Sequence, residues 1–304
     1  MQGRKIFVRI FIVFFLITTI FIVYFYTLLQ SATTKSVSKA FEVKEGDSTA
    51  VIASKLQQKG LIKSAFAFRV YKQISGSILV PGVYVIDSSE NVSSILNTIA
   101  KGKSSVIKVT LLEGWRAKDI EEYMVNEKGL SQFIGFTKKA EKYEGYLYPD
   151  TYEILLIITP DEFIKLLRDT FVTKTKSLNP TSDQVILASI IEREAASDSE
   201  RADIAGVYTN RLKIGMRLEA DPTIQYAKGN WQAVTLAEYR SVISPYNTYL
   251  NDGLPPTPIA NPSVKSIEAA INPAKHNYYF FFHANGNIYF SKTLSEHKEK
   301  LKSL

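Results

Sequence analysis

The sequence predicts an α+β protein in which one apolar N-terminal helix precedes two folded regions. Three patterns predict this class. An uncharged apolar stretch covers residues 10–29, a strand-turn-helix pattern occurs twice between residues 40 and 130, and an Asn-Gly turn near residue 285 joins two strand-like segments. We therefore expect a short N-terminal tip and a membrane-anchoring helix at 1–29, a linker at 30–39, a small α+β domain at 40–104 and a larger α+β domain at 105–304.

Composition describes a folded chain of ordinary type. The 304 residues are 45% hydrophobic and 22% charged, which suits one or two globular domains after the apolar stretch. The chain has no cysteine, so disulfides and a lipid-modified cysteine anchor are excluded. A net charge of +7 suits proximity to anionic lipid or an acidic polymer. Because the lysines are scattered and no nucleic-acid motif occurs, we expect no nucleic-acid partner.

The apolar stretch is long enough to cross a membrane. Ile10–Leu29 contains 20 uncharged residues, and at about 1.5 Å per residue they span a hydrocarbon core of about 30 Å. Arg4, Lys5 and Arg9 precede the stretch, so we expect the N-terminus in the cytoplasm and the folded regions outside. The alternative is a cleaved signal peptide, whose apolar region is about 7 to 15 residues and therefore shorter.

The first folded region reads as a strand, a turn and a helix. The expected elements are a strand at Phe41–Val43, a helix at Ala50–Gln58 that ends at Gly60, a strand at Gly82–Val85 and a helix at Val92–Ile99. The pattern recurs 68 residues later, with a strand at Val109–Leu111 and a helix that carries Ile120 and Met124 and ends at Gly129.

A short motif gives this region a resemblance. Residues 43–53 read V-K-E-G-D-S-T-A-V-I-A, which resembles the LysM module, a small peptidoglycan-binding fold. The resemblance implies a LysM-like domain at 40–104. An adaptor that only spaces the second region from the membrane remains the alternative.

A carboxylic acid interrupts the apolar face of a predicted helix at residues 185–195. Thr181 followed by Gln184 is a capping box that begins this helix. At a period of about 3.6 residues, Glu194 falls between Leu187 and Ile190, near the centre of the apolar arc, and Glu192 lies on the far side.

A carboxyl group among aliphatic side chains loses solvation in its charged form. This raises its pKa and lets Glu194 deliver a proton near neutral pH, as a general acid does. The alternative is a structural ion pair, for which Arg193, Arg201 and Arg211 are the candidates.

The remaining pattern is helical and then strand-like. A second helix runs through Ile204 and Leu212 and ends at Gly215. Segments Tyr278–Phe282 and Asn287–Phe290 flank the Asn-Gly turn, and Thr293 followed by Glu296 begins a closing helix.

Taken together, these blocks resemble the membrane-anchored endolytic murein transglycosylases, the YceG-like family. The resemblance covers nearly the whole chain. It is carried by E-G-Y-L-Y-P-D-T-Y (144–152), A-S-I-I-E-R-E (188–194), N-R-L (210–212), G-M-R-L (215–218), D-P-T (221–223), Y-N-T-Y (246–249), G-L-P-P (253–256), Pro258-Ile259 and N-P-A (272–274). The catalytic glutamate of the family, the second of the E-x-E pair, corresponds to Glu194. Ala195 stands where related enzymes have Ser or Thr, which removes a local hydroxyl contact.

The resemblance implies a lyase that cleaves MurNAc–GlcNAc bonds and leaves 1,6-anhydro ends. One carboxyl group acts as acid and then base in that reaction, with no second carboxylate and no water. A muramidase would need a partner carboxylate, for which Asp221 and Glu219 are candidates, although Asp221 before Pro222 is also typical of a turn or cap. A non-catalytic wall-binding or division scaffold is the second alternative.

Substrate contacts are expected from polar and aromatic groups. The candidates are Tyr246, Asn247, Tyr249, Gln225 and Asp221, with core packing as the alternative for the two tyrosines. The three histidines lack metal-ligand spacing, so we expect no metal and no cofactor. The family resemblance implies peptidoglycan strands and the cytoplasmic membrane as partners, and peptidoglycan synthases as further ones.

Overall fold

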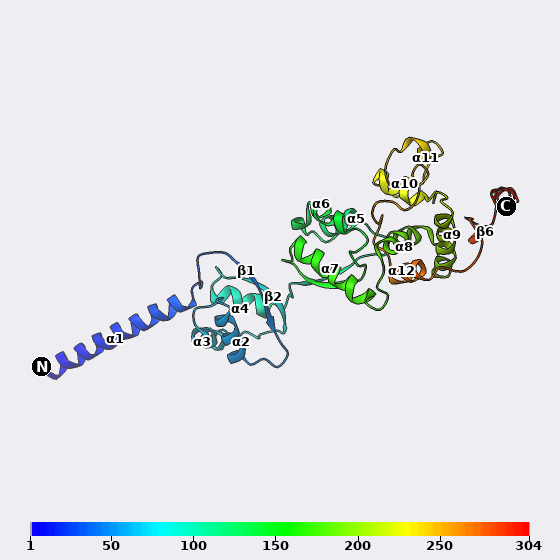
Figure 1. Ribbon diagram of the computed structural model, residues 1–304. Coiled ribbons are helices and arrows are strands. Elements are labelled where there is room, and N and C mark those ends of the chain that lie inside the picture. The colour runs from blue at the N-terminus through cyan, green and yellow to red at the C-terminus, as the bar shows by residue number, and fades with distance from the viewer. Residues whose placement is uncertain (1, 304) are drawn as a thin grey trace. The chain divides into compact units, whose positions relative to one another are not determined.

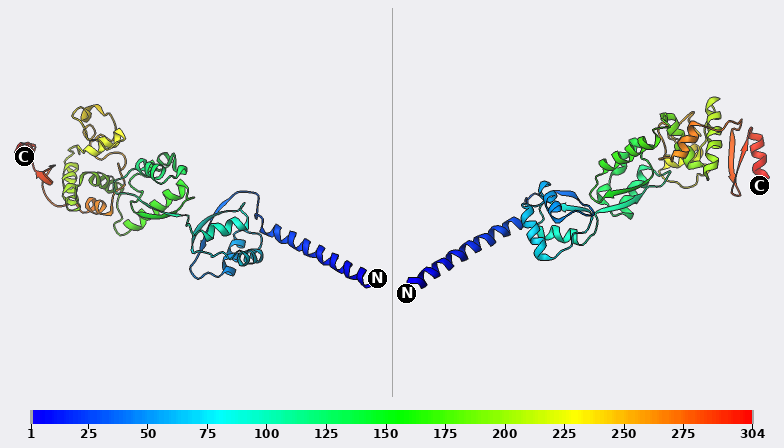
Figure 2. Two further views of the ribbon diagram at one scale, coloured as in Figure 1. Left: turned by 180° about the vertical axis from the view of Figure 1, so that it is seen from behind. Right: turned by 90° about the horizontal axis from the view of Figure 1, so that it is seen from below.

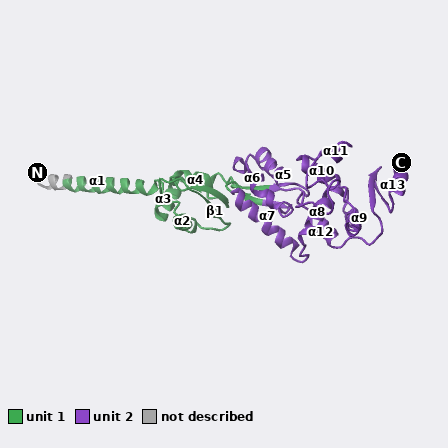
Figure 3. Cartoon of the chain, turned by 45° about the horizontal axis from the view of Figure 1, so that its top comes forward, with its two compact units in different colours: residues 1–108, 153–157 green, residues 109–152, 158–304 purple. Residues whose placement is uncertain are grey.

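A computed structural model gives the structure of the chain and describes residues 2–303. Helices and strands alternate irregularly, and each described strand pairs with one other strand (Figure 1). The chain is a mixed α and β protein with an apolar helix at its N-terminus. It divides into two compact units, unit 1 with residues 1–108 and 153–157 and unit 2 with residues 109–152 and 158–304 (Figure 3).

The first helix, α1, runs without interruption from Gln2 to Leu29. Its segment Arg9–Leu29 is long and apolar enough to cross a membrane. The hydroxyls of Thr18, Thr19 and Thr27 donate to carbonyls of the preceding turn at 2.7 to 2.8 Å. Hydrocarbon offers no partner for a hydroxyl, so these internal bonds suit a membrane-crossing helix.

Unit 1 continues with a strand, two helices and a second strand. β1 (Ser38–Val43) pairs antiparallel with β2 (Gly82–Asp87), and Phe41 lies opposite Tyr84. Helices α2 (Thr49–Gln58) and α3 (Ala65–Ser75) lie between the strands in sequence, and α4 (Val92–Ala100) follows. Their inward faces form one core, which includes Phe41, Leu56, Phe68, Tyr84 and Ile95, all 1% exposed or less.

Unit 2 begins with short elements. Its bounds in the sequence fall within two short strands, β3 (Val106–Thr110) and β4 (Thr151–Leu155), which pair with each other. The other elements are α5 (Ala117–Glu122), a π-helical turn (Tyr123–Glu127), α6 (Phe136–Ala140), α7 (Pro160–Thr175), and 3-10 turns at Ser131–Phe133 and Glu141–Tyr143. Phe133 packs edge-on against Phe163, with ring centroids 5.5 Å apart, which joins this part to α7.

The second part of unit 2 is a helical core. Helix α8 (Ser182–Glu194) lies beside α9 (Arg201–Lys213) and α12 (Val264–Ile271), as Figures 1 and 2 show. The other elements are α10 (Asp221–Lys228), α11 (Glu238–Ser241), a 3-10 turn (Asp198–Glu200), β5 (Phe280–Ala284), β6 (Asn287–Ser291) and α13 (Leu294–Lys302). Because α8 is covered on several sides, Val185 through Ile191 are all buried.

Several predicted elements are confirmed. β5 and β6 form the antiparallel hairpin, and Asn285 and Gly286 in its turn have φ of 50° and 75°. The Thr181 and Thr293 caps accept from the backbone N–H of Gln184 and Glu296. One prediction was wrong in part: the helix expected to carry both Ile120 and Met124 ends at Glu122, and Met124 lies in the π-helical turn.

Candidate active site

Glu194 is the last residue of α8, at the end opposite the Thr181 cap. The helix is fixed along its length by buried aliphatic side chains, and Ser189 is also fully buried. Its hydroxyl donates to the Ile186 carbonyl and accepts from the backbone N–H of Ile259 at 3.0 Å. The carboxyl group of Glu194 is therefore held by a rigid element, and the residue as a whole is half-buried.

Tyr208 on α9 is the direct partner of Glu194. Its hydroxyl donates to Glu194 Oε1 at 2.8 Å, and the tyrosine is 2% exposed. Burial raises the pKa of Glu194 to about 7; the Tyr208 hydrogen bond lowers it, the charge of Asp221 raises it and Arg211 lowers it. Burial also raises the pKa of Tyr208 well above its ordinary value, so its hydroxyl remains a donor.

Asp221 interacts electrostatically with Glu194, because its charge raises the pKa of that carboxyl group. It is the first residue of α10, where the helix dipole favours an anion. The Tyr249 hydroxyl donates to one carboxylate oxygen at 2.6 Å and the Tyr239 hydroxyl to the other at 3.4 Å. The two tyrosine rings lie 4.3 Å apart, so they form one aromatic wall beside the carboxylate.

Two buried side chains place Asp221. Arg211 is 6% exposed, and its guanidinium donates to the carbonyls of Arg217 and Leu218 at 3.1 and 2.8 Å, which fixes the segment before α10. Thr248 is 1% exposed, and its hydroxyl accepts from the Ala220 N–H at 3.0 Å. The D-P-T and Y-N-T-Y motifs are thus joined by hydrogen bonds and position one another.

The other predicted contact residues have different surroundings. Asn247 is fully buried, and its amide donates to the carbonyls of Tyr239 and Val242 at 3.2 and 2.8 Å. The Tyr246 hydroxyl bonds Thr257 at 2.7 Å. Gln225 donates to the Gln232 carbonyl at 3.1 Å. Of the predicted set, Asp221 and Tyr249 are hydrogen-bonded to each other and the charge of Asp221 acts on Glu194, while the side chains of Asn247 and Gln225 bond loop carbonyls.

None of the three arginines considered as ion-pair partners forms a salt bridge with Glu194 in the described residues. Arg201 pairs with Glu192 at 3.1 Å, and Arg211 with Glu219 at 3.3 Å. Arg193 stacks on the Trp231 ring, with 3.9 Å from its guanidinium carbon to the ring centroid. Glu192 also accepts from the Ser263 hydroxyl, so the first glutamate of the E-x-E pair joins α8 to the start of α12.

Glu144 is a second buried carboxyl group, at the start of the E-G-Y-L-Y motif. It is 4% exposed and accepts from the Ala117 N–H at 3.1 Å and the Asn261 amide at 2.8 Å. Burial raises its pKa to about 8. Because Asn261 also accepts from the backbone N–H groups of Gly145 and Leu147, this network fixes the motif against the loop before α12.

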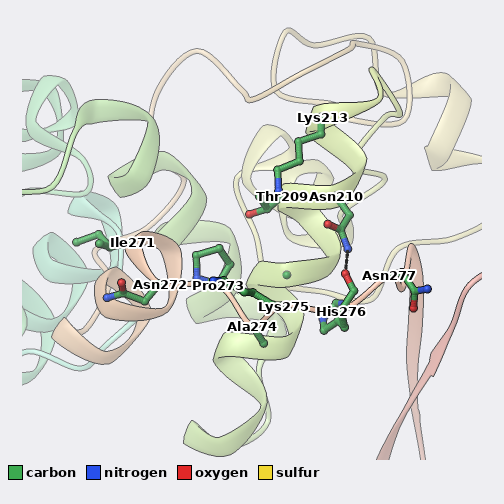
Figure 4. A pocket seen from close by; sticks show the side chains of 11 residues that line it. Thr209, Asn210, Lys213, Ile271, Asn272, Pro273, Ala274, Lys275, His276 and Asn277 are labelled. Carbon is green, nitrogen blue, oxygen red and sulfur yellow. Dashed lines mark hydrogen bonds between the residues drawn. The ribbon is translucent and has the colours of Figure 1, made fainter.

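A cavity of about 650 Å³ lies between α9 and the segment that follows α12 (Figure 4). Thr209, Asn210 and Lys213 line it from the helix. Helical periodicity places these positions opposite residue 208. The size of a cavity therefore does not identify the site in this chain; the environment of the carboxyl groups does.

The histidines have packing partners. His276 accepts from the Tyr278 N–H at Nδ1 and contacts the Asp203 carbonyl at 2.9 Å through Nε2. His283 lies 3.1 Å from Glu200, and His297 packs against Phe282. Within residues 2–303, no group of three or more potential ligands is placed to hold a metal ion.

The sequence did not single out Tyr208, Tyr239 or Thr248 as site residues, and it offered Arg211 only as a possible ion-pair partner of Glu194. Tyr208 could have been found, since it lies on the apolar face of the predicted second helix with Ile204 and Val207, which must face a neighbouring helix. Thr248 lies in an irregular segment and Tyr239 in the four-residue helix α11, which is too short for a period to indicate which side chains turn inward.

Comparisons with known proteins agree with these motifs. The chain is 32% identical over 298 residues to an endolytic murein transglycosylase of Bacillus subtilis, covering 84% of this chain and 82% of that protein. It is 27% identical to an endolytic murein transglycosylase of Streptococcus pneumoniae over 84% of this chain, and spans 56% of that relative's length. The crystal structure of a yceG-like protein from Listeria monocytogenes matches with a TM-score of 0.55 and 29% identity, over 88% of this chain and 100% of that one. The YceG-like family model matches residues 41–303, and the chain belongs to this family.

Proposed function

We propose that the chain is a membrane-anchored lytic transglycosylase that cuts peptidoglycan strands internally, with Glu194 as general acid and then general base. Its Bacillus and Streptococcus relatives are named endolytic murein transglycosylases. The observation that carries the proposal is the Glu194 carboxyl group at the end of α8, whose pKa burial raises to about 7 and whose partner is Tyr208.

The reaction needs one group that gives a proton and later takes one. Protonated Glu194 donates its proton to the oxygen of the MurNAc–GlcNAc bond, and the bond from the anomeric carbon to that oxygen breaks. The Glu194 carboxylate then takes the proton of the C6 hydroxyl of the same MurNAc. The C6 oxygen bonds the anomeric carbon and closes a 1,6-anhydro ring. Glu194 ends protonated again, and no water is consumed.

A pKa of about 7 suits both halves of this cycle. Much of Glu194 is protonated near neutral pH, as the first step requires, and the carboxylate that this step leaves is basic enough to take a proton in the second. The bond from Tyr208 remains in place in either form, because its hydroxyl can donate to Oε1 throughout.

Asp221 has a supporting role in this proposal. Its carboxylate accepts from Tyr249 and Tyr239, which hold it in place. Positive charge develops at the anomeric carbon as the bond breaks, and a fixed anion on that side of the site stabilises it. The same position makes a muramidase the second candidate, because a hydrolase uses a second carboxylate.

Mass analysis of digested peptidoglycan tests the two candidates. A transglycosylase gives anhydro ends, each one water lighter than the ends a hydrolase gives. We expect anhydro ends from the parent, and from Asp221→Asn the same ends at a lower rate. Hydrolysed ends from the parent, lost in Asp221→Asn, would establish the muramidase instead. A parent that cleaves no glycan would indicate the scaffold.

The proposed location follows from the charge next to α1. Arg4, Lys5 and Arg9 stand before the span, so the N-terminus is placed in the cytoplasm and residues 30–304 outside. The proposed domains are a LysM-like one at 40–104 and a catalytic one at 105–304, with Glu194 and Asp221 both in the latter.

A further inference from the structure

Helix α3 exposes an apolar stripe. Phe66, Val70 and Ile74 are spaced four residues apart and so lie on one face. Phe66 is 59% exposed, Ile74 is 75% exposed, and Ile78 just beyond the helix is 77% exposed. The buried side of α3 is apolar as well: Ala67 and Phe68 are fully buried, and Phe68 belongs to the core of unit 1. A surface helix ordinarily turns a polar face to water, so an exposed apolar stripe indicates an interaction surface.

The stripe is flanked by basic side chains. Helix α3 reads A-F-A-F-R-V-Y-K-Q-I-S, with Arg69 and Lys72 and no acidic residue. A shallow groove of about 370 Å³ runs along it, lined in part by Phe66, Arg69 and Ile74. An apolar face bordered by Lys and Arg is the pattern of a helix that lies in a lipid interface.

The helix also begins at the depth where a bilayer would end. Lys63, just before α3, donates from Nζ to the carbonyl of Thr27 in the last turn of α1, at 3.2 Å. Leu29 packs against the core of unit 1, and α1 contacts α3 directly. Figure 3 shows α3 beside the end of α1. The start of α3 therefore lies next to the final turn of the apolar span.

We propose that α3 docks into the outer surface of the membrane that α1 crosses. Phe66, Val70 and Ile74 enter the upper acyl region, while Arg69 and Lys72 contact anionic headgroup phosphates. This inference rests on the proposed anchoring by α1. The contact by α3 would add to the packing of α1 on unit 1 and hold the unit against the bilayer surface at a second place.

The absence of cysteine makes a direct test possible, because one introduced thiol is the only labelling site. The full chain is placed in vesicles of phosphatidylglycerol and phosphatidylcholine, with an environment-sensitive fluorophore on Ile74→Cys. Quenching is measured with lipids brominated in the upper acyl chain. Ile17→Cys, in the middle of the span, and Lys103→Cys, exposed in the loop before β3, are the controls.

We expect the Ile74 and Ile17 labels to be quenched at least twofold more than the Lys103 label. Quenching at Ile17 with none at Ile74 would overturn the docking and leave the α1 anchor standing. No quenching at Ile17 would refute the anchor, and the docking with it. An Ile74 label that responds to added soluble glycan fragments and not to brominated lipid would assign the stripe to a glycan and refute the proposal.

Charge reversal tests the headgroup contact separately. Arg69→Glu with Lys72→Glu should reduce quenching of the Ile74 label in phosphatidylglycerol vesicles toward the value in pure phosphatidylcholine. The matched reversal at Lys101 and Lys103 should leave it unchanged. An equal effect of the two double variants would contradict a specific contact by α3.

Discussion

The hydrogen bond between Tyr208 and Glu194 is the contact on which the proposed chemistry depends most closely. Burial favours the neutral acid, and the Tyr208 hydroxyl opposes that effect by favouring the carboxylate. Together these opposing effects leave the pKa of Glu194 at about 7. The distance of 2.8 Å between the Tyr208 hydroxyl and Glu194 Oε1 is that of a well-formed hydrogen bond.

Tyr208→Phe removes that hydroxyl and keeps the buried ring. The pKa of Glu194 should rise by about one unit, because a hydrogen bond to a charged group contributes about 1.5 kcal/mol or more. The pH–rate profile should move to higher pH by that amount, with about tenfold loss at the optimum. Tyr152→Phe is the control, since the Tyr152 hydroxyl bonds the Tyr148 carbonyl. An unmoved profile in Tyr208→Phe would show that Glu194 is not the titrating group.

Glu144 makes a prediction about stability. Its pKa is 4.5 when unperturbed and about 8 in the fold, so the folded chain holds a proton that the unfolded chain releases. The stabilisation is complete below about pH 4.5 and is lost as the pH rises toward 8, by up to about 1.4 kcal/mol per pH unit.

Glu144→Gln should therefore flatten the fall of the unfolding free energy over that window. Denaturant unfolding at several pH values measures it, and Glu153→Gln, at an exposed carboxyl group, is the matched control. A slope that Glu144→Gln leaves unchanged would contradict a protonated Glu144.

Sequence could predict part of this site and not the rest. The 3.6-residue spacing of the apolar side chains in residues 185–191 indicated that Glu194 lies on the apolar face of its helix. Its tyrosine partner lies 14 residues away on another helix, and Asp221 is oriented by Tyr249 from a third segment. Such contacts depend on how the elements pack, which no local pattern contains.

Helix α8 holds Glu194 at its last residue, and the capping box in its first turn stabilises the helix. The Thr181 side chain accepts from the Gln184 N–H at 3.3 Å, and Gln184 accepts from the Thr181 N–H at 2.8 Å. Thr181→Ala should lower the unfolding free energy by about 1 kcal/mol. It should leave the rate at low temperature unchanged, because Glu194 lies at the other end. Thr173→Ala, in the exposed part of α7, is the control, and equal losses in the two variants would contradict the cap.

The loop that carries Glu144 depends on the close approach of the Gly145 backbone to Pro258. Gly145 has φ of 87°, and an added Cβ would lie 2.4 Å from Pro258 Cγ. Gly135 has nearly the same φ, 85°, with nothing within 4 Å of an added Cβ. Gly135→Ala should cost about 1 to 2 kcal/mol of unfolding free energy from backbone strain alone. Gly145→Ala should cost clearly more, and equal costs would show that the loop moves aside.

The fold was predictable where the period was clear. The hairpin and the capped helices α8 and α13 have strong turn and cap residues. Helix α3 was not predicted, because Phe66 and Ile74 on its outward face and Phe68 on its inward face remove the apolar period that identifies a surface helix. The same exposed apolar side chains that hide the helical period of α3 are the ones proposed to contact the membrane.

For the whole molecule, the charges before the span predict which side each part occupies. A membrane-impermeant thiol reagent should label Lys103→Cys in intact cells, or in spheroplasts where a wall barrier must be removed. It should label Phe7→Cys only after the membrane is permeabilised, since position 7 precedes the span. Labelling of Phe7→Cys in intact cells would reverse the proposed orientation.

The most direct test of Glu194 as the acid is the amount of anhydro ends that the full chain and Glu194→Gln release from purified peptidoglycan. Glutamine keeps the size of the side chain and cannot donate the proton, so we predict a loss of about a hundredfold or more with unchanged thermal unfolding. Anhydro ends formed by Glu194→Gln at the parent's rate would contradict it.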